Sequence, residues 1–271
     1  MIKLSYAVAL ADCRAKKMQC FRGDLDAVCG ELKALGYDGV ELFARNPREL
    51  DLASVQATIR RHALLVPEIS TGPASEDGLS LTDPDATVRE RARERLHDYA
   101  DMAARWGAQM HLGRIRGTIP EGPGAEDAWK RMKEGFLDLA EYAGRRGVRV
   151  LLEPQCRFQG NALLSVADGL AFVQELGHPN LGIVADTFHM SIEDVSIPAA
   201  LVAARAHLWH VHFADSNRRY PGGGHTNFPE IVEALRLIGY DRSITMEMDQ
   251  APDSSTAARR AIRFVRALLD N

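Results

Sequence analysis

The segment Leu151–Pro154, with the sequence LLEP, decides the fold, because an apolar run ends there abruptly on a carboxylate. The same pattern recurs in Ile183–Asp186 (IVAD), His210–His212 (HVH) and Ile244–Glu247 (ITME). Each run belongs to a short, mainly apolar segment, which is typical of a buried strand in a parallel sheet. Consecutive strands that end on a carboxylate or an imidazole predict a functional site at one edge of that sheet.

Similar apolar runs alternate with helical segments along the whole chain. The predicted strands cover residues 4–8, 39–43, 64–67, 109–112, 148–152, 181–185, 208–212 and 243–248. Helical spacing and capping signals predict helices between them, such as 24–35 and 52–61. This alternation over 271 residues, without a break in composition, predicts an α/β fold with one (βα)8 TIM barrel domain spanning residues 1–271.

An open, doubly wound sheet is the structural alternative. If such a sheet bound a nucleotide, a glycine-rich turn would follow its first strand. The segment Ser5–Ala9 has no such turn, and the glycine cluster Gly222–Gly224 lies far from it, after the seventh strand. The closed barrel is therefore favoured.

The composition indicates an ordinary soluble globular protein, with 46% hydrophobic and 26% charged residues. A net charge of -4 gives no broad basic field, so we expect no nucleic-acid partner. No apolar run approaches the ~18 residues of a membrane span, so we expect no membrane partner. Cys13, Cys20, Cys29 and Cys156 form no CxxC pair, and no secretory segment precedes them. They predict reduced thiols and a cytoplasmic location.

The strand-end groups are Glu153, Asp186, His212 and Glu247. The carboxyl ends of barrel strands form one rim, where active sites lie. Taken alone, Asp186 would fit a helix cap and His212 a core histidine. Three carboxylates on one arc repel each other unless a cation or shared protons compensate. Together the four groups predict one divalent metal; Mn²⁺ fits this oxygen-rich set best, with Mg²⁺, Co²⁺ and Zn²⁺ as alternatives.

The half of the chain from about residue 148 to 248 resembles the sugar phosphate isomerase/epimerase superfamily, the xylose-isomerase-like barrels. The matching segments lie in Leu152–Phe158, Ala185–His189, His210–Arg218 and Thr245–Glu247, and their order is most similar to that of ketose 3-epimerases. The resemblance implies a metal-dependent isomerase or epimerase of a ketose or ketose phosphate. It would work by proton transfer through a metal-stabilised enediolate, in a homodimer or homotetramer.

The resemblance also implies roles for single residues. Glu153 and Glu247 would be metal ligands that double as the catalytic proton-transfer groups, on opposite faces of the substrate. His189 and Arg218 would contact the substrate's oxygens. A metal that chelates the ketose would polarise its carbonyl group.

The segment Cys156–Gln159 departs from the ketose 3-epimerase pattern, which has an amide side chain in place of Cys156 and a glutamate in place of Gln159. Gln159 can hydrogen-bond to a substrate but cannot act as a base. This departure keeps an alternative open, a metal-dependent lyase or dehydratase of a keto-sugar or inosose. There, the same enolisation would expel a leaving group from the β carbon.

Arginines near the strand ends predict a cationic rim that would bind a phosphate or carboxylate of the substrate. The set is Arg114, Arg116, Arg157, Arg218 and Arg219. For Arg116 and Arg219, an exposed loop position is an equally good interpretation.

The segment 219–227 is long for a loop of this kind and is either a lid or a surface turn, with His225 as its substrate contact. We expect His210 to support the site from within the barrel, and Glu41 to line the pocket. His111 is expected to pack, and Asp215 to orient Arg218 or cap a turn.

Overall fold

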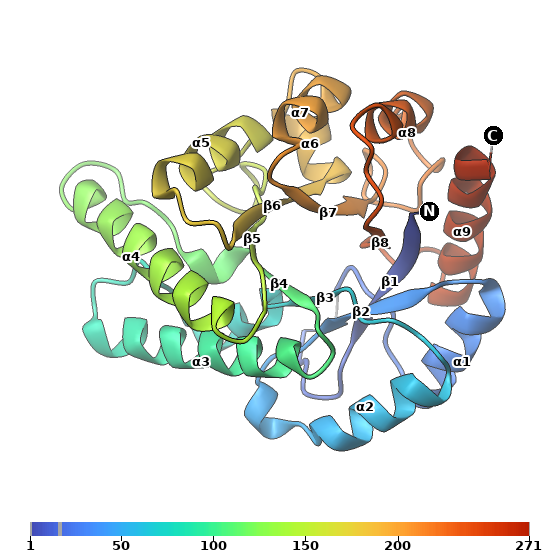
Figure 1. The fold of residues 1–271 in the computed structure, drawn as a ribbon, viewed down its shortest axis with the longest axis horizontal. Coiled ribbons are helices and arrows are strands. Elements are labelled where there is room, and N and C mark those ends of the chain that lie inside the picture. Colours follow the sequence, from blue (N-terminus) through green and yellow to red (C-terminus); the bar gives the residue numbers. More distant parts are fainter. Residues whose placement is uncertain (1, 16–17, 271) are drawn as a thin grey trace.

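The computed structural model describes residues 2–15 and 18–270 and shows a closed barrel of eight parallel strands in sequential order (Figure 1). The strands are β1 (Lys3–Ala9), β2 (Gly39–Phe43), β3 (Glu68–Ser70), β4 (Gln109–Leu112), β5 (Val150–Leu152), β6 (Leu181–Asp186), β7 (Leu208–Phe213) and β8 (Ser243–Met246). The pairing of β1 with β8 closes the barrel. The predicted TIM barrel is confirmed.

Helices surround the barrel as an outer ring (Figure 1). The α-helices are α1 (Leu25–Leu35), α2 (Leu52–Arg61), α3 (Ala86–Ala104), α4 (Ala125–Gly144), α5 (Val166–Leu176), α6 (Thr187–Glu193), α7 (Ile197–Ala204), α8 (Phe228–Leu237) and α9 (Ser254–Asp270). Short 3-10 helices are η1 (Pro47–Glu49), η2 (Gly72–Asp77) and η3 (Arg114–Arg116). None of the helices in the described part of the chain combines the length and apolar character needed to cross a membrane.

Capping residues explain several helix boundaries. Asp24 accepts a hydrogen bond from the Ala27 amide at the start of α1, and Gly36 ends that helix with a positive φ of 96°. Ser165 and Asp168 form a reciprocal capping box at the start of α5. The ends of α1 agree with the helix predicted over residues 24–35.

The strand register places the functional side chains at one rim. Asp186 on β6 pairs directly with His212 on β7, after a register shift between Ile183 and Val184. On the other side of β6, the Glu153 amide, just past β5, donates to the Leu112 carbonyl of β4. Glu247 follows β8 immediately. Four consecutive strands thus present their terminal side chains side by side.

Two predicted details of the fold were wrong. The third strand lies at Glu68–Ser70, not at 64–67, because Pro67 precedes the paired segment and Leu65 is 53% exposed. The sequence reading also missed α6, a helix of seven residues that starts directly after β6. Asp186 caps this helix by accepting from the Phe188 amide.

Candidate metal centre

Four buried side chains converge where the last four strands end. Glu153, Asp186, His212 and Glu247 each offer one ligand atom, and these atoms all lie within 4.8 Å of one another. Nδ1 of His212 lies 2.7 Å from Oε2 of Glu247 and 3.3 Å from Oε1 of Glu153. The structure therefore brings together all four residues predicted as metal ligands.

Each of these side chains has one buried polar atom that forms no hydrogen bond with the described residues. The four atoms are Oε1 of Glu153, Oδ2 of Asp186, Nδ1 of His212 and Oε2 of Glu247. Buried polar atoms in proteins are nearly always hydrogen-bonded, whereas ion-pair contacts of His212 with Glu153 and Glu247 are what links these four, so one common partner would satisfy them all. A divalent cation supplies one, and the three oxygens and one nitrogen are a suitable ligand set.

The second polar atom of each ligand is held by a neighbour, as is usual around metal sites. The pairs are Gln155 Nε2 donating to Glu153 Oε2 (2.6 Å), the Phe188 amide donating to Asp186 Oδ1 (2.8 Å), His212 Nε2 with Glu41 Oε2 (3.0 Å), and Arg218 Nη2 donating to Glu247 Oε1 (3.3 Å). These contacts turn the unpaired atom of every ligand toward the same point.

The close packing of these buried groups shifts the pKa values of two of them. Burial, together with Glu247 and Glu153, raises the pKa of Asp186 to about 7. Burial opposes charge on His212, but Glu41 and Glu247 outweigh it and hold the pKa of that imidazole well above its ordinary value. Both shifts arise from the close approach of several buried carboxylates, whose repulsion a bound cation would offset.

A second group of buried ionisable residues lies beneath the centre. Nε2 of His210 is 3.1 Å from Oε2 of Glu68 and 3.3 Å from Oε2 of Glu41, and His111 Nδ1 is 3.4 Å from Glu68 Oε1. The ring nitrogens of His210 and His212 that face this group are already hydrogen-bonded, to Thr245 Oγ1 and Glu41 Oε2. The group therefore orients His212 from below, which is the supporting role expected for His210.

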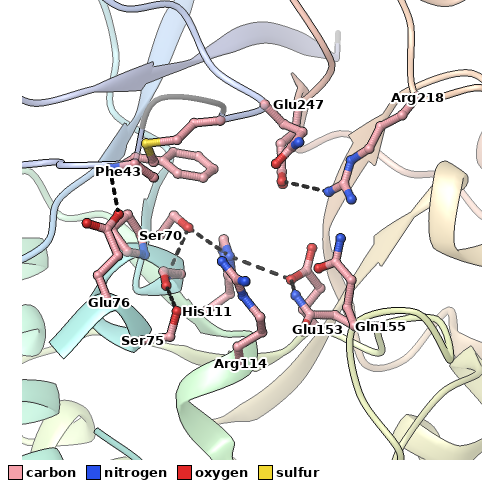
Figure 2. Close-up of a pocket in the computed structure, with 16 residues that line it drawn as sticks. Phe43, Ser70, Ser75, Glu76, His111, Arg114, Glu153, Gln155, Arg218 and Glu247 are labelled. Atoms are coloured by element: carbon pink, nitrogen blue, oxygen red, sulfur yellow. Dashed lines mark hydrogen bonds and ion pairs between the residues drawn. The ribbon is translucent and has the colours of Figure 1, made fainter. Parts of the chain in front are cut away.

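A pocket of about 320 Å³ opens above the centre (Figure 2). Figure 2 shows Arg218 reaching Glu247 on one side, with His111 between Ser70 and Glu153 on the other. The wall opposite the metal ligands comes from the first half of the chain, and includes Met18, Phe43, Ser70, Glu76 and Arg114.

Several predicted substrate contacts lie at this pocket. Arg114, Gln159 and Arg218 line it. Arg218 has a positive φ of 60°, and its guanidinium lies over the Phe188 ring at 4.6 Å. His189 is buried beside the centre, with Nε2 3.7 Å from Asp186 Oδ2. Burial lowers its pKa to about 3, so His189 is neutral at ordinary pH.

Other predicted contacts are placed elsewhere. The guanidinium of Arg157 faces away from the pocket and pairs with Glu193 at 2.7 Å, and Nδ1 of His225 pairs with Ser216 Oγ at 3.1 Å. Arg219 is exposed, whereas Arg116 is 2% exposed and lies beneath the rim. Asp215 organises the turn rather than the Arg218 side chain, since its carboxylate accepts from backbone amides.

The sequence reading missed two residues that support the centre, and it assigned His111 only to packing. Glu68 was overlooked because the third strand was placed too early, although a carboxylate before Ile69 interrupts an apolar run. Gln155 was overlooked because nothing in the sequence indicates that its amide turns back to Glu153. His111 in fact lines the pocket; burial opposes its charge, but Glu68, Glu153 and Glu41 raise its pKa to about 9.

Comparison with known proteins agrees with this fold and site. The chain belongs to the xylose isomerase-like TIM barrel family, whose model matches residues 29–268. The curated relatives include an L-ribulose 3-epimerase from Methylomonas sp., 29% identical over 83% of this chain and 78% of that protein. A D-psicose 3-epimerase from Ruminiclostridium cellulolyticum is 31% identical over 79% of this chain and 74% of that protein.

The solved structures show the same barrel. A D-allulose 3-epimerase from Methylomonas sp. superposes with a TM-score of 0.84, covering 99% of this chain and 98% of that chain, at 22% identity. The predicted membership of this superfamily and the predicted enzyme class, a sugar isomerase or epimerase, are confirmed.

Proposed function

We propose that the chain is a metal-dependent 3-epimerase of free ketoses. The observation that carries this proposal is the convergence of four unpaired, buried ligand atoms at the floor of a polar pocket. The names of its relatives, L-ribulose and D-psicose 3-epimerase, support the substrate class and the carbon that is inverted.

The residues around the centre suit transfer of a proton at a carbon next to a carbonyl group. When bound, a divalent cation supplies Lewis-acid polarisation of that carbonyl. Glu153 and Glu247 approach from different strands and both line the pocket. One of them takes the proton from C3, which leaves an enediolate, and the other returns a proton to the opposite face.

Arg218 and His189 complete the proposed site. The Arg218 guanidinium lies 3.3 Å from Glu247 and lines the pocket, so it can stabilise negative charge that develops on a substrate oxygen. His189, buried and neutral, has an unpaired Nε2 that is available for a hydrogen bond.

The charges in the pocket favour a substrate without a phosphate group. Two of the five arginines predicted to form a cationic rim line the pocket, Arg114 and Arg218. Arg218 pairs with Glu247, whereas Arg114 has no carboxylate partner among the described residues. Glu76 lines the same pocket and would repel an anion. A single exposed arginine opposed by a carboxylate is a poor phosphate site.

The test is to incubate the Mn²⁺-loaded protein in D2O with a panel of free ketoses, ketose phosphates and keto-inositols, and to follow the products by NMR. We expect inversion of a free ketose with deuterium incorporated at C3. Loss of water from a substrate would instead identify a dehydratase. Absence of exchange with every member of the panel would refute the proton-transfer mechanism.

A further inference from the structure

Glu153 is held by a side chain whose own orientation is fixed. The Gln155 amide donates through Nε2 to Glu153 Oε2 at 2.6 Å, and its Oε1 accepts from Arg116 Nη1 at 3.3 Å. Gln155 is 7% exposed and Arg116 2% exposed. Because a guanidinium can only donate, Arg116 fixes which end of the amide is oxygen and so directs the NH2 group to Glu153.

Arg116 is unusual because it is buried without a carboxylate partner among the described residues. Its guanidinium donates to the backbone carbonyls of Gly113 and Glu153 at 3.0 Å and of Ala162 at 3.2 Å. Burial lowers its pKa to about 10, so the group is still charged at neutral pH. Burying a charge that is paired only with carbonyls and one amide costs free energy. The groups that Arg116 contacts lie around Glu153 and the loop that follows it.

Gly113 leaves the space that this arrangement needs. A Cβ atom at Gly113 would lie 2.7 Å from Nε2 of Gln155 and 3.1 Å from Oε2 of Glu153. Both distances are shorter than a normal van der Waals contact. The backbone that follows β4 thus passes so close to the hydrogen bond between Gln155 and Glu153 that only a glycine fits there.

We infer that Gln155 is a positioning residue for Glu153, and that Arg116 acts through Gln155. The amide occupies Oε2 of Glu153, so that Oε1 alone is presented toward Asp186, His212 and Glu247. Glu153 is then a ligand through one oxygen, in a fixed rotamer. As far as catalysis is concerned, this inference rests on the proposed epimerase function, but the positioning itself can be tested with metal alone.

The test measures the affinity of the protein for Mn²⁺ by competition with a fluorescent chelator. Gln155→Leu removes the donor, and Gln155→Met removes it while keeping the length of the side chain. We expect both variants to bind Mn²⁺ about 10- to 100-fold more weakly, as when other supporting contacts of metal ligands are lost. Gln109→Leu is the matched control, since the Gln109 amide donates to the Trp209 carbonyl, away from the centre.

A double-mutant cycle separates positioning from general loss of structure. If Arg116 acts through Gln155, then Arg116→Met should weaken Mn²⁺ binding, and combining it with Gln155→Leu should add little more. In kinetics, the loss should fall on kcat rather than on KM. Thermal unfolding of each variant checks that it is folded; if Arg116→Met is not, the two Gln155 variants decide the question alone.

The outcomes distinguish this inference from the proposed function. Mn²⁺ affinity in both Gln155 variants equal to that of Gln109→Leu would overturn the positioning role, even if the protein is an epimerase. Weakened Mn²⁺ binding in a protein that epimerises no ketose would uphold the positioning role and refute the proposed function.

Discussion

At the scale of single residues, the centre depends on the charge and the orientation of its carboxylates. Glu247 is a proposed metal ligand, a proton-transfer group and the partner of Arg218. Glu247→Gln keeps the shape of the side chain but removes its charge and its basicity. We expect turnover to fall by at least about 10²- to 10⁴-fold, the usual contribution of a general acid or base.

Steady-state kinetics of Glu247→Gln measure this loss, and circular dichroism shows whether the variant is folded. Glu233→Gln, on the exposed face of α8, makes the same change where the carboxylate pairs only with Arg236 and should leave turnover unchanged. Turnover near the wild-type rate in Glu247→Gln would contradict the mechanism.

Metal binding should depend on pH because two of the four predicted ligands, Asp186 and His212, have raised pKa values. The pKa of Asp186 is raised to about 7 and that of His212 is held well above its ordinary value. Both ligands must lose a proton to bind, so the apparent affinity should rise with pH. Below pH 7, protons on both groups compete with the metal, whereas above pH 7 mainly the proton on His212 does. The apparent affinity should therefore rise more steeply with pH below pH 7 than above it.

Isothermal titration of the metal in two buffers with different protonation enthalpies counts the protons released. We expect net release near neutral pH and a smaller release in Asp186→Asn. An apparent affinity that is constant across neutral pH would show that neither ligand is protonated in the metal-free protein.

At the scale of elements, the loop between β7 and α8 presents Arg218 to the pocket. The buried carboxylate of Asp215 holds this loop by accepting from the backbone amides of Ser216, Gly222 and Thr226 at 2.7, 2.9 and 3.0 Å. A Cβ atom at Gly224 would lie 2.4 Å from Oδ1 of Asp215, so the turn closes tightly around the carboxylate.

Asp215→Ala leaves these amides without their acceptor. We expect a loss of stability of about 1–3 kcal/mol in chemical denaturation, since each unpaired buried group is costly, together with weaker activity because Arg218 loses its support. Asp241→Ala, in the exposed turn before β8, is the control and should change stability by less than about 0.5 kcal/mol. Equal stability of the two variants would mean that the loop does not depend on Asp215.

The alternation of strands and helices was predictable because periodicity and caps are local properties of the sequence. So was the centre, because each ligand ends an apolar strand, as Asp186 and Glu247 do. Gln155 and Glu68 were not predictable, since their roles depend on side-chain directions set by packing. Arg157 was assigned to the pocket because an arginine near a strand end looks the same whether it faces a substrate or, as here, Glu193.

At the scale of the whole molecule, the barrel buries five carboxylates within one end of its interior. They are Glu41, Glu68, Glu153, Asp186 and Glu247. A metal bound to the folded state alone should stabilise the protein by about 2.7 kcal/mol at a free concentration about 100 times its Kd.

Thermal unfolding with and without Mn²⁺ measures this effect. We expect the midpoint to rise with Mn²⁺ and to return on addition of a chelator, and Asp186→Asn should show a much smaller shift. A midpoint temperature that does not change at saturating Mn²⁺ would contradict a metal site built from these carboxylates.

The four predicted metal ligands come from the ends of β5 to β8, whereas the opposite wall of the pocket comes from the first half of the chain. The later strands therefore supply the predicted metal ligands, whereas the first half of the chain supplies the pocket surface that faces them. Substitutions at Phe43 or Arg114 should therefore alter what the pocket admits, whereas Ser70 also reaches the centre through His111, which lies 3.9 Å from Glu153. The first half is nevertheless not free to vary throughout, because Glu41 orients His212 and Arg116 holds Gln155 beside Glu153.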